Sequence, residues 1–296
     1  MARLNLLVSV VLLSFITHSA FAQDQLSRGR LDNLYKKGLE LVNLSNYGAA
    51  REVFTQYLQQ SAGPDTRRAE AEYYLAYCAL NLGHSDAEKR IEDFIDSNPA
   101  NPRSITAYLD LANFFYNEKN YAKASASYAK VNISALTPDQ RTEANFKWGY
   151  SLFSQKKLDE ALTKFNAVKI QNSEYAAAAN YYAGFIEFAN GNYDDAYTDL
   201  KRAELNASYA TVVPQLLANV LYKQKRYDDL IQYEIALRPR ATTITNYSEI
   251  SMLAADAYYF KKDYSSAVAA YETYLKENKS KAPASLLYRA GHAYYS

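Results

Sequence analysis

The chain has 296 residues, of which 29 are tyrosine, 9 glycine, 7 proline and one cysteine. The shortage of glycine and proline argues against a turn-rich β-sandwich or barrel, and a single cysteine excludes an intrachain disulfide framework. The 33 lysine and arginine residues are interspersed with 32 aspartate and glutamate residues, so the sequence lacks the basic surface that nucleic-acid binding requires.

Residues 1–22 have the pattern of a secretory signal. Arg3 precedes an apolar run from Leu4 to Ile16, and Ala20-Phe21-Ala22 forms a cleavage motif. The apolar run is shorter than the about 20 residues that span a bilayer, which favours cleavage over a membrane anchor. No cysteine follows the motif, so a lipoprotein anchor is not expected there. We therefore expect export to the periplasm of a Gram-negative bacterium, or secretion as the alternative, with residues 23–29 as a short lead.

A repeat begins near residue 30 and continues to the end of the chain. The string Asn46-Tyr47-x-x-Ala50 returns at Asn120 and Asn192, and looser copies fill the intervals. The seven anchor residues are Ala50, Ala87, Ala124, Ala161, Ala196, Leu230 and Ala267. They are spaced by 34 to 37 residues, and such a constant period is the signature of a repeat architecture.

Each repeat is predicted to be two antiparallel helices joined by a short turn. A small residue precedes each anchor by about twelve positions, and the residues after the anchor have the i, i+3, i+4, i+7 spacing of an amphipathic helix. The small residues are Gly38, Ala76, Ala112, Gly149, Gly184, Ala218 and Ala255, and Gly291 begins one more unit. The prolines fall between units or at helix starts, where they cost little. In Thr137-Pro138-Asp139-Gln140 the pattern predicts a capping box.

These units resemble the tetratricopeptide repeat family, whose second helix carries an A-x₃-F pair. The pair is intact as Ala50/Phe54 and Ala161/Phe165, whereas the sixth unit has Glu234 at the aromatic position. The resemblance covers residues 30–296. It implies an all-α, right-handed superhelical solenoid of tandem antiparallel helix pairs, with seven repeats and the first helix of an eighth in one continuous domain.

The last residues, Ala284 to Ser296, have the pattern of a first helix without its partner. Natural arrays finish with a polar capping element, and Tyr294-Tyr295-Ser296 is not polar in that sense. We therefore expect a longer protein of which this is the N-terminal part, with a natural C-terminal capping helix as the alternative.

The sequence offers little for catalysis. Outside the signal, the histidines are His84, in a predicted turn, and His292, on the last helix. No cluster of histidine, cysteine and acidic residues has metal-ligand spacing, and Cys78 lies in an apolar helical run where a small buried side chain is expected. We expect no enzyme activity, no cofactor and no metal.

A stripe of aromatic residues follows the first helices, one position after the small residues. In the tetratricopeptide family the first helices line the concave wall, so the resemblance implies a partner-binding groove there. The candidate groove residues are Tyr73, Tyr77, Tyr116, Phe146, Tyr150, Phe153, Tyr181, Phe185, Phe188, Tyr222 and Tyr259. Tyr288, His292 and Tyr295 continue the stripe on the last helix. Aromatic rings give large contact areas at little entropic cost, but packing against the next repeat is the alternative role for each of them.

The leading functional hypothesis is a non-enzymatic periplasmic scaffold that binds a protein or peptide partner in envelope assembly or secretion. Phe146 and Tyr150 stand where chaperone-binding members of the family carry carboxylate-clamping residues, so a co-chaperone of that kind is not favoured. A glycan-binding envelope protein is one alternative, because aromatic rings also stack on sugars. The other is a docking arm for an enzyme or membrane domain beyond residue 296. The mature part is not expected to span a membrane.

Overall fold

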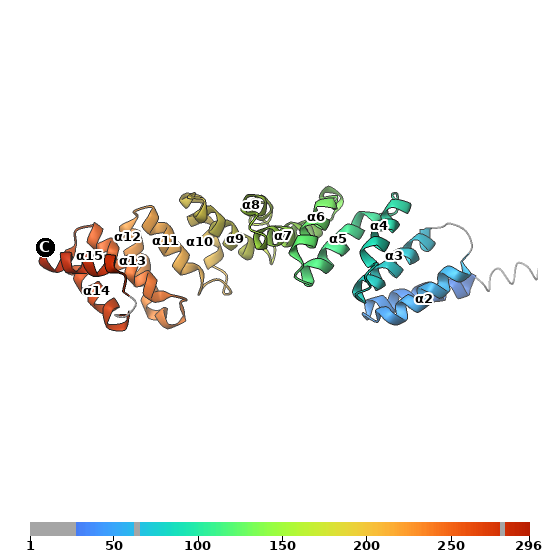
Figure 1. Ribbon diagram of the computed structural model, residues 1–296, viewed down its shortest axis with the longest axis horizontal. Helices are drawn as coiled ribbons and strands as arrows, with labels where there is room; N and C mark the ends of the chain where they lie inside the picture. Colours follow the sequence, from blue (N-terminus) through green and yellow to red (C-terminus); the bar gives the residue numbers. More distant parts are fainter. Residues whose placement is uncertain (1–27, 62–65, 279–281) are drawn as a thin grey trace, which may run out of the picture. The chain divides into compact units, whose positions relative to one another are not determined.

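The computed structural model describes residues 28–61, 66–278 and 282–296. The predicted signal (residues 1–22) and most of the lead (residues 23–29) lie outside these ranges, whereas residues 28 and 29 already belong to a helix. The described residues form helices and turns without any strand, which confirms the predicted all-α class (Figure 1). None of their helices is both long enough and apolar enough to cross a membrane.

The chain divides into two compact units, Met1–Leu136 and Thr137–Ser296. Within the first unit, helices that follow one another pack as pairs joined by tight turns. The pairs are residues 28–43 with α2 (Tyr47–Gln60), α3 (Thr66–Asn81) with α4 (Ala87–Ser97), and α5 (Pro102–Asn117) with α6 (Tyr121–Lys130), after which η1 (Ile133–Ala135) forms a 3₁₀ turn.

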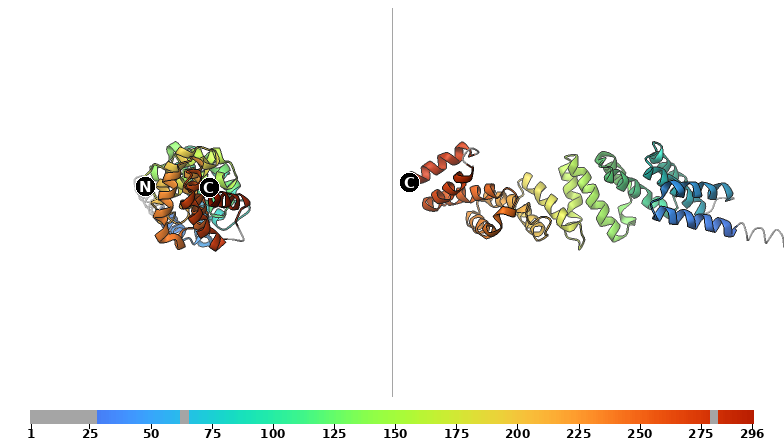
Figure 2. Two further views of the ribbon diagram at one scale, coloured as in Figure 1. Left: turned by 90° about the vertical axis from the view of Figure 1, so that its left-hand side faces the viewer. Right: turned by 90° about the horizontal axis from the view of Figure 1, so that it is seen from below.

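The second unit is built in the same way, and its consecutive helices pack against each other. Figure 2 shows the ribbon from two further directions. Its pairs are α7 (Pro138–Ser154) with α8 (Leu158–Asn166), α9 (Ala176–Ala189) with α10 (Tyr193–Glu204), α11 (Val213–Lys223) with α12 (Tyr227–Leu237), and α13 (Tyr247–Phe260) with α14 (Tyr264–Asn278). A 3₁₀ segment, η2 (Arg238–Thr243), follows α12, and α15 (Ala284–Tyr295) comes last.

The turn inside each pair has a common hydrogen-bond pattern that ends the first helix. After α9, the Asn192 amide donates to the Glu187 carbonyl (2.8 Å) and the Gly191 amide donates to the Phe188 carbonyl (3.1 Å). This is a Schellman motif, which satisfies the last carbonyls of a helix and requires a left-handed residue. Gly191 has φ +82°, and the matching turn position is held by Ser45, Lys119, Lys156, Lys225 and Lys262, all with φ between 56° and 63°.

The second pair has the same two hydrogen bonds, from the His84 amide to the Ala79 carbonyl and from the Gly83 amide to the Leu80 carbonyl (both 3.0 Å), but its anchor is one residue closer to the left-handed position. Gly83 is left-handed (φ +71°) and stands four residues before its anchor, Ala87, instead of the five that separate Gly191 from Ala196. Helix α4 begins at Ala87 itself, whereas α10 begins three residues before its anchor, at Tyr193.

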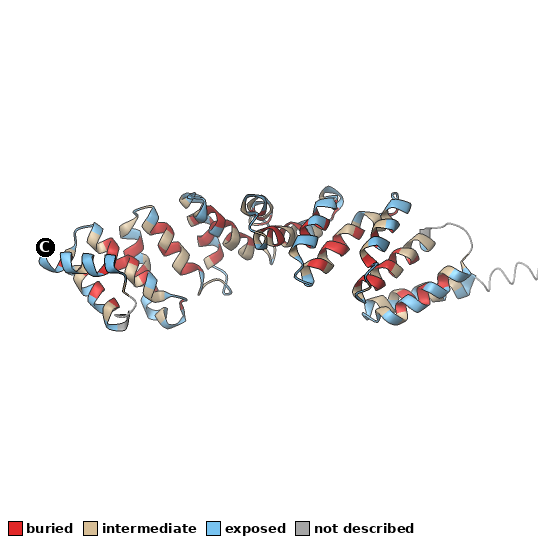
Figure 3. Ribbon diagram, viewed as in Figure 1, coloured by how far each residue is buried: buried red, intermediate tan, exposed pale blue. Residues whose placement is uncertain are grey.

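The anchors and small residues form the centre of each pair, along the buried stripe of the helices in Figure 3. Ala50, Ala161 and Ala196 are fully buried. A Cβ atom added to Gly149 would lie 3.0 Å from the Phe165 ring, and one added to Gly184 would lie 2.7 Å from Leu200 Cγ. Both distances are shorter than ordinary van der Waals contact, so a residue without a side chain is needed for the two helices to approach this closely.

The sixth pair keeps its second helix although Glu234 replaces the aromatic residue. The Glu234 side chain is buried and forms an ion pair with Arg238, whose Nη2 donates to Oε2 at 2.8 Å. The Tyr247 hydroxyl donates to Oε1 at 2.6 Å. A buried carboxylate is tolerated when a cation neutralises its charge and donors form hydrogen bonds with its oxygens. Here Tyr247, one of these donors, belongs to the next repeat.

We expect Thr137→Ala to destabilise the second unit by about 1 kcal/mol, because it removes the cap of α7. The Gln140 amide donates to Thr137 Oγ1 (3.3 Å), and the Thr137 amide donates to Gln140 Oε1 (3.1 Å). Thr163→Ala is the matched control, since this exposed hydroxyl only bonds to the Asp159 carbonyl within α8. Urea denaturation followed by circular dichroism measures both changes, and equal midpoints would contradict the role of the cap.

Candidate functional site

The aromatic surface of α7 and α9 is a cluster of rings on two first helices of the second unit. Tyr182 lies at its centre, with its ring centroid 5.4 Å from that of Tyr150 and 5.0 Å from that of Phe153. Phe153 also contacts Phe185 edge-on (5.7 Å), and Tyr181 contacts Tyr209 (5.1 Å). Tyr182, which lies outside the predicted stripe, therefore joins the two helices.

The rings of this surface differ in how much of them remains accessible. Phe185 is 39% exposed, whereas Phe146 is 9% exposed and stacks on Tyr175 at 4.9 Å. The remaining predicted residues of α7 and α9 are half-buried, namely Tyr150, Phe153, Tyr181 and Phe188. The accessible part is thus a shallow strip of ring edges around Phe185, and Phe146 belongs to the packing beneath it.

A second aromatic cluster runs from α11 to α15. Tyr222 contacts Tyr227 and Phe260, each at 6.3 Å, and Tyr227 stacks on Phe260 at 5.6 Å. Tyr259 contacts His292 of α15 at 5.6 Å. Phe260 is 45% exposed, while Tyr222 and Tyr259 are half-buried. These rings connect successive repeats. The Phe260 ring is the most accessible apolar side chain among those named here.

In the first unit the predicted residues mainly serve packing. Tyr73 is 2% exposed, and its hydroxyl donates to Asp110 Oδ2 at 2.5 Å. Tyr77 stacks on Tyr73 (5.9 Å), and Tyr116 contacts Tyr121 edge-on (5.9 Å). Tyr77 and Tyr116 are both half-buried, so only part of each ring is accessible to a binding partner.

Burial keeps the hydroxyls of Tyr77, Tyr182 and Tyr209 neutral at physiological pH. Burial, reinforced by neighbouring phenols, raises the pKa of Tyr182 and Tyr209 above the ordinary value. Burial likewise raises the pKa of Tyr77 to about 12. A neutral phenol offers an apolar ring and one hydroxyl that both donates and accepts. The surface is therefore suited to side chains and backbone groups that carry no net charge.

The sequence pattern did not point to the buried acids that underlie these surfaces. Glu187, Asp199, Glu234 and Asp256 are all less than 5% exposed. Glu187 and Glu234 stand where the other repeats carry apolar residues, and that substitution was the signal available in the sequence. Asp199 and Asp256 stand where other repeats also carry polar residues, so no such signal marks them. Their cationic partners lie in other turns and helices, such as Lys169 for Asp199 (2.5 Å) and Arg289 for Asp256 (2.6 Å).

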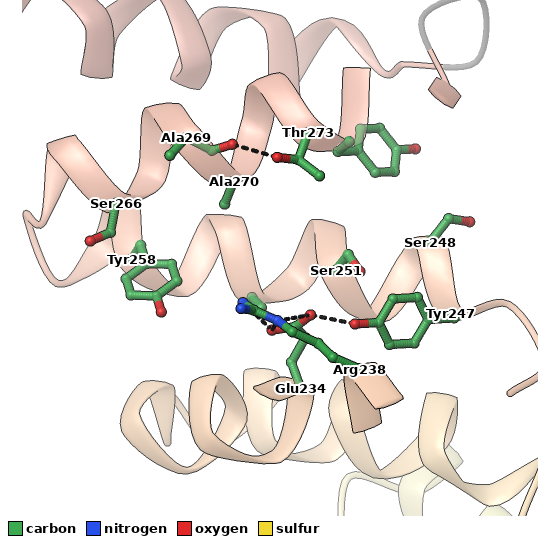
Figure 4. A pocket seen from close by; sticks show the side chains of 12 residues that line it. Glu234, Arg238, Tyr247, Ser248, Ser251, Tyr258, Ser266, Ala269, Ala270 and Thr273 are labelled. Carbon is green, nitrogen blue, oxygen red and sulfur yellow. Dashed lines mark hydrogen bonds and ion pairs between the residues drawn. The ribbon is translucent and has the colours of Figure 1, made fainter. Parts of the chain in front are cut away.

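A pocket of about 510 Å³ lies between α12, α13 and α14 (Figure 4). The Glu234–Arg238 ion pair and the Tyr247 hydroxyl form one wall. Serine and threonine side chains line much of the remainder, including Ser251 and Thr273. The lining presents hydroxyl groups and one guanidinium beside alanine and tyrosine side chains, and its acid is already paired with Arg238.

The described residues contain no group of three or more histidine, cysteine and acidic side chains that could hold a metal ion. Cys78 is buried, and burial raises the pKa of its thiol to about 11, so this thiol is not an activated nucleophile. His292 packs between the rings of Tyr259 and Tyr264. Cys78 and His292 thus pack against neighbouring side chains.

Comparison with known proteins bears on the fold. The family model described as a tetratricopeptide repeat matches residues 35–86 and 146–210. The sequence thus matches the tetratricopeptide repeat family over these two segments. The C-terminal part of a TPR repeat-containing protein from Cytophaga hutchinsonii superposes with a TM-score of 0.50 at 16% identity, over 86% of this chain and 98% of that one.

Two other solved structures are similar at lower scores. A tetratricopeptide repeat protein from Parabacteroides merdae gives a TM-score of 0.46 at 13% identity, covering 89% of this chain and 98% of that one. Pseudomonas aeruginosa pilF gives 0.47 at 17% identity, covering 75% and 97%. None of the curated proteins matches the sequence. At these identities the likeness is one of fold, and tetratricopeptide arrays as a class present extended binding surfaces to other proteins.

Proposed function

We propose that this tetratricopeptide repeat protein is a non-enzymatic scaffold that binds a protein or peptide partner through the aromatic surface of α7 and α9. The observation that supports this proposal is the strip of partly accessible aromatic rings formed by Tyr150, Tyr181 and Phe185. Rigid aromatic side chains of this kind dominate the binding energy of protein interfaces. An extended segment or an amphipathic helix fits such a strip better than a charged ligand does.

The proposed location is the bacterial periplasm, in envelope assembly or secretion. It is supported by the signal pattern of residues 1–22. Mass spectrometry of the protein from osmotic-shock fractions tests it. The expected mature N-terminus is Gln23. A cytoplasmic protein that still begins at Met1 would refute the location without touching the scaffold proposal.

The scaffold proposal is tested by replacing Tyr150, Tyr181 and Phe185 with alanine together. Partner recovery by crosslinking in the native compartment is expected to fall by at least about tenfold, because losing more than 1.4 kcal/mol of contact energy has that effect. The control replaces Ile170 and Leu205 with alanine, which are 72% and 87% exposed and lie in turns after second helices.

Circular dichroism and thermal melting establish that the triple variant keeps its fold. Unchanged recovery by a folded triple variant would refute the aromatic surface as the binding site. Equal losses in the triple variant and in the control would show that the effect is not specific to these rings.

A glycan is the second candidate ligand, and the pocket of Figure 4 is the observation that favours it. Hydroxyl-bearing side chains such as Ser251 and Thr273, together with Tyr258, line a cavity of about 510 Å³. A glycan array separates this candidate from the first. Glycan binding that is lost in Ser251→Leu and retained in the triple aromatic variant would assign the function to the pocket.

A further inference from the structure

In the second unit, polar side chains bridge the space between one second helix and the next. The residue eight positions after one anchor meets the residue three positions after the following anchor. Lys169 Nζ lies 2.5 Å from Asp199 Oδ2, which connects the turn after α8 to α10. The Tyr233 hydroxyl donates to Glu204 Oε1 at 2.5 Å, which connects α12 to α10. The repeat therefore places two complementary polar groups at these positions.

Between α12 and α14 the same two positions are held by Arg238 and Ala270. Alanine offers no polar group, and Arg238 pairs instead with Glu234, four residues earlier, to which its Nε and Nη2 atoms donate. A guanidinium carries five N–H groups. Arg238 therefore keeps donors for a further acceptor on the side where the repeat elsewhere supplies a bridging partner.

The space between the helices is larger where the bridging side chain is missing. The pocket of Figure 4 has a volume of about 510 Å³ and is lined by Arg238, Ala254 and Ala270. The corresponding cavity between α10, α11 and α12 measures about 270 Å³ and is lined by Leu217 and Tyr233. Ala254 precedes the small residue of its helix as Leu217 does. Two large side chains of the sixth repeat are thus alanine in the seventh.

The opening of this pocket does not depend on how many repeats follow it. The cavity between α10, α11 and α12 persists although α13 and α14 come after it in the array. A following repeat therefore leaves this position uncovered. The larger size of the pocket between α12 and α14 is accounted for by Ala254 and Ala270, which belong to the pocket itself.

We propose that this pocket binds a planar aromatic ring that carries an oxygen acceptor. The ring would take the place that the Tyr233 side chain fills in the preceding repeat, and Arg238 would donate to the oxygen. Tyr247, Tyr258 and Tyr274 supply aromatic walls for it. The same chemistry is found in a free phenol and in a tyrosine side chain of a peptide. This ligand site goes beyond the scaffold function and lies apart from the aromatic surface of α7 and α9.

The probe is p-cresol, which is a tyrosine side chain without its backbone. Titration of the whole chain, followed by ligand-observed NMR, is expected to give a dissociation constant on the order of 1 mM, because so small a ligand makes few contacts. Toluene lacks the oxygen and should bind about tenfold more weakly, since a hydrogen bond to a charged group is lost. Tighter binding of a capped tripeptide with a central tyrosine would identify the source as a peptide, and weaker binding a free phenol.

Two variants test the pocket itself. Ala270→Tyr restores the bridging ring of the sixth repeat and should weaken p-cresol binding at least about tenfold, because the ring occupies the space. Arg238→Lys keeps the charge beside Glu234 but has fewer donors, so it should weaken p-cresol and leave toluene unchanged. Ser265→Tyr is the matched control, at an exposed position of α14 outside the pocket lining. Circular dichroism establishes that each variant is folded.

Equal affinities of the wild type and a folded Ala270→Tyr, or of p-cresol and toluene, would overturn the proposal. Absence of saturable binding would also overturn it, and glycan binding that Ala270→Tyr abolishes would then assign the pocket to a glycan. The triple variant of Tyr150, Tyr181 and Phe185 is expected to bind p-cresol normally. Loss of binding in that variant would place the ligand on the aromatic surface and overturn the pocket as its site.

Discussion

Replacing Asp256 with alanine is expected to destabilise the second unit by about 3–5 kcal/mol and to release α15 first. The Asp256 carboxylate is 3% exposed. It accepts hydrogen bonds from Arg289 Nε (2.8 Å) and Nη2 (2.6 Å) and from the Tyr271 hydroxyl (2.6 Å). Because Arg289 belongs to α15, the substitution leaves a largely buried guanidinium without its counter-charge. Hydrogen exchange should show loss of protection in α15 before any other helix of the unit.

Asp228→Ala is the control for this experiment. Asp228 is 80% exposed and pairs with Lys261 on the surface, where an ion pair contributes about 0–1 kcal/mol. The double variant Asp256→Leu with Arg289→Met should recover most of the lost stability, because apolar residues often replace a buried ion pair without penalty. A loss below about 1 kcal/mol in Asp256→Ala would show that the pair does not hold α15.

Glu187→Gln is expected to change the pH dependence of stability. Burial, together with the neighbouring Asp199 carboxylate, raises the pKa of Glu187 to about 7 from the ordinary value near 4.5. Lys169 lies 3.4 Å from Glu187 Oε1 and 2.5 Å from Asp199 Oδ2, and Arg202 lies 3.5 Å from Asp199 Oδ1. Glu187 Oε2 is buried without a hydrogen-bond partner, which further disfavours the charged form.

The direction of the pH dependence is set by how strongly Glu187 binds a proton in the folded and in the unfolded protein. Between pH 4.5 and 7 the folded protein binds more protons at Glu187 than the unfolded chain does, so stability falls as the pH rises through this window. The stabilising contribution is full below about pH 4.5 and is lost above about pH 7. The wild-type protein should therefore lose up to about 3 kcal/mol from this group between pH 5 and pH 8.

Glu187→Gln should remove this loss, so that it is the more stable protein at pH 8. Denaturant unfolding at a series of pH values measures the difference, and Glu160→Gln, at an exposed position of α8, is the control. Parallel pH profiles for the wild type and Glu187→Gln would contradict a proton held at Glu187.

The helix pairs were predictable from the sequence because their determinants are local. The positions of Asn46, Asn120 and Asn192 before their second helices fix where those helices begin, and the left-handed residue one position earlier ends the preceding helix. The capping box at Thr137 was likewise readable from four consecutive residues. Glu234 replaces the aromatic residue of the repeat pattern in the sixth pair, yet α12 forms. The buried Glu234 carboxylate accepts hydrogen bonds from Tyr247 and Arg238.

What each aromatic residue does was decided only by the tertiary structure. Tyr73 and Phe185 both belong to the predicted aromatic stripe, but one is 2% and the other 39% exposed. The difference depends on side chains that arrive from elsewhere in the chain, such as Asp110 against Tyr73 and Tyr182 between Tyr150 and Phe153.

The sequence alone thus determined the repeat, the helix boundaries and the position of each glycine contact, since hydrogen bonding and amphipathic spacing act over a few residues. Burial and ion pairing were decided by the tertiary structure, because they depend on which side chains neighbouring helices bring together. A periodic pattern specifies which face of a helix is apolar. It does not specify which side chains another helix brings onto that face, and that difference separates the buried Tyr73 from the partly exposed Phe185.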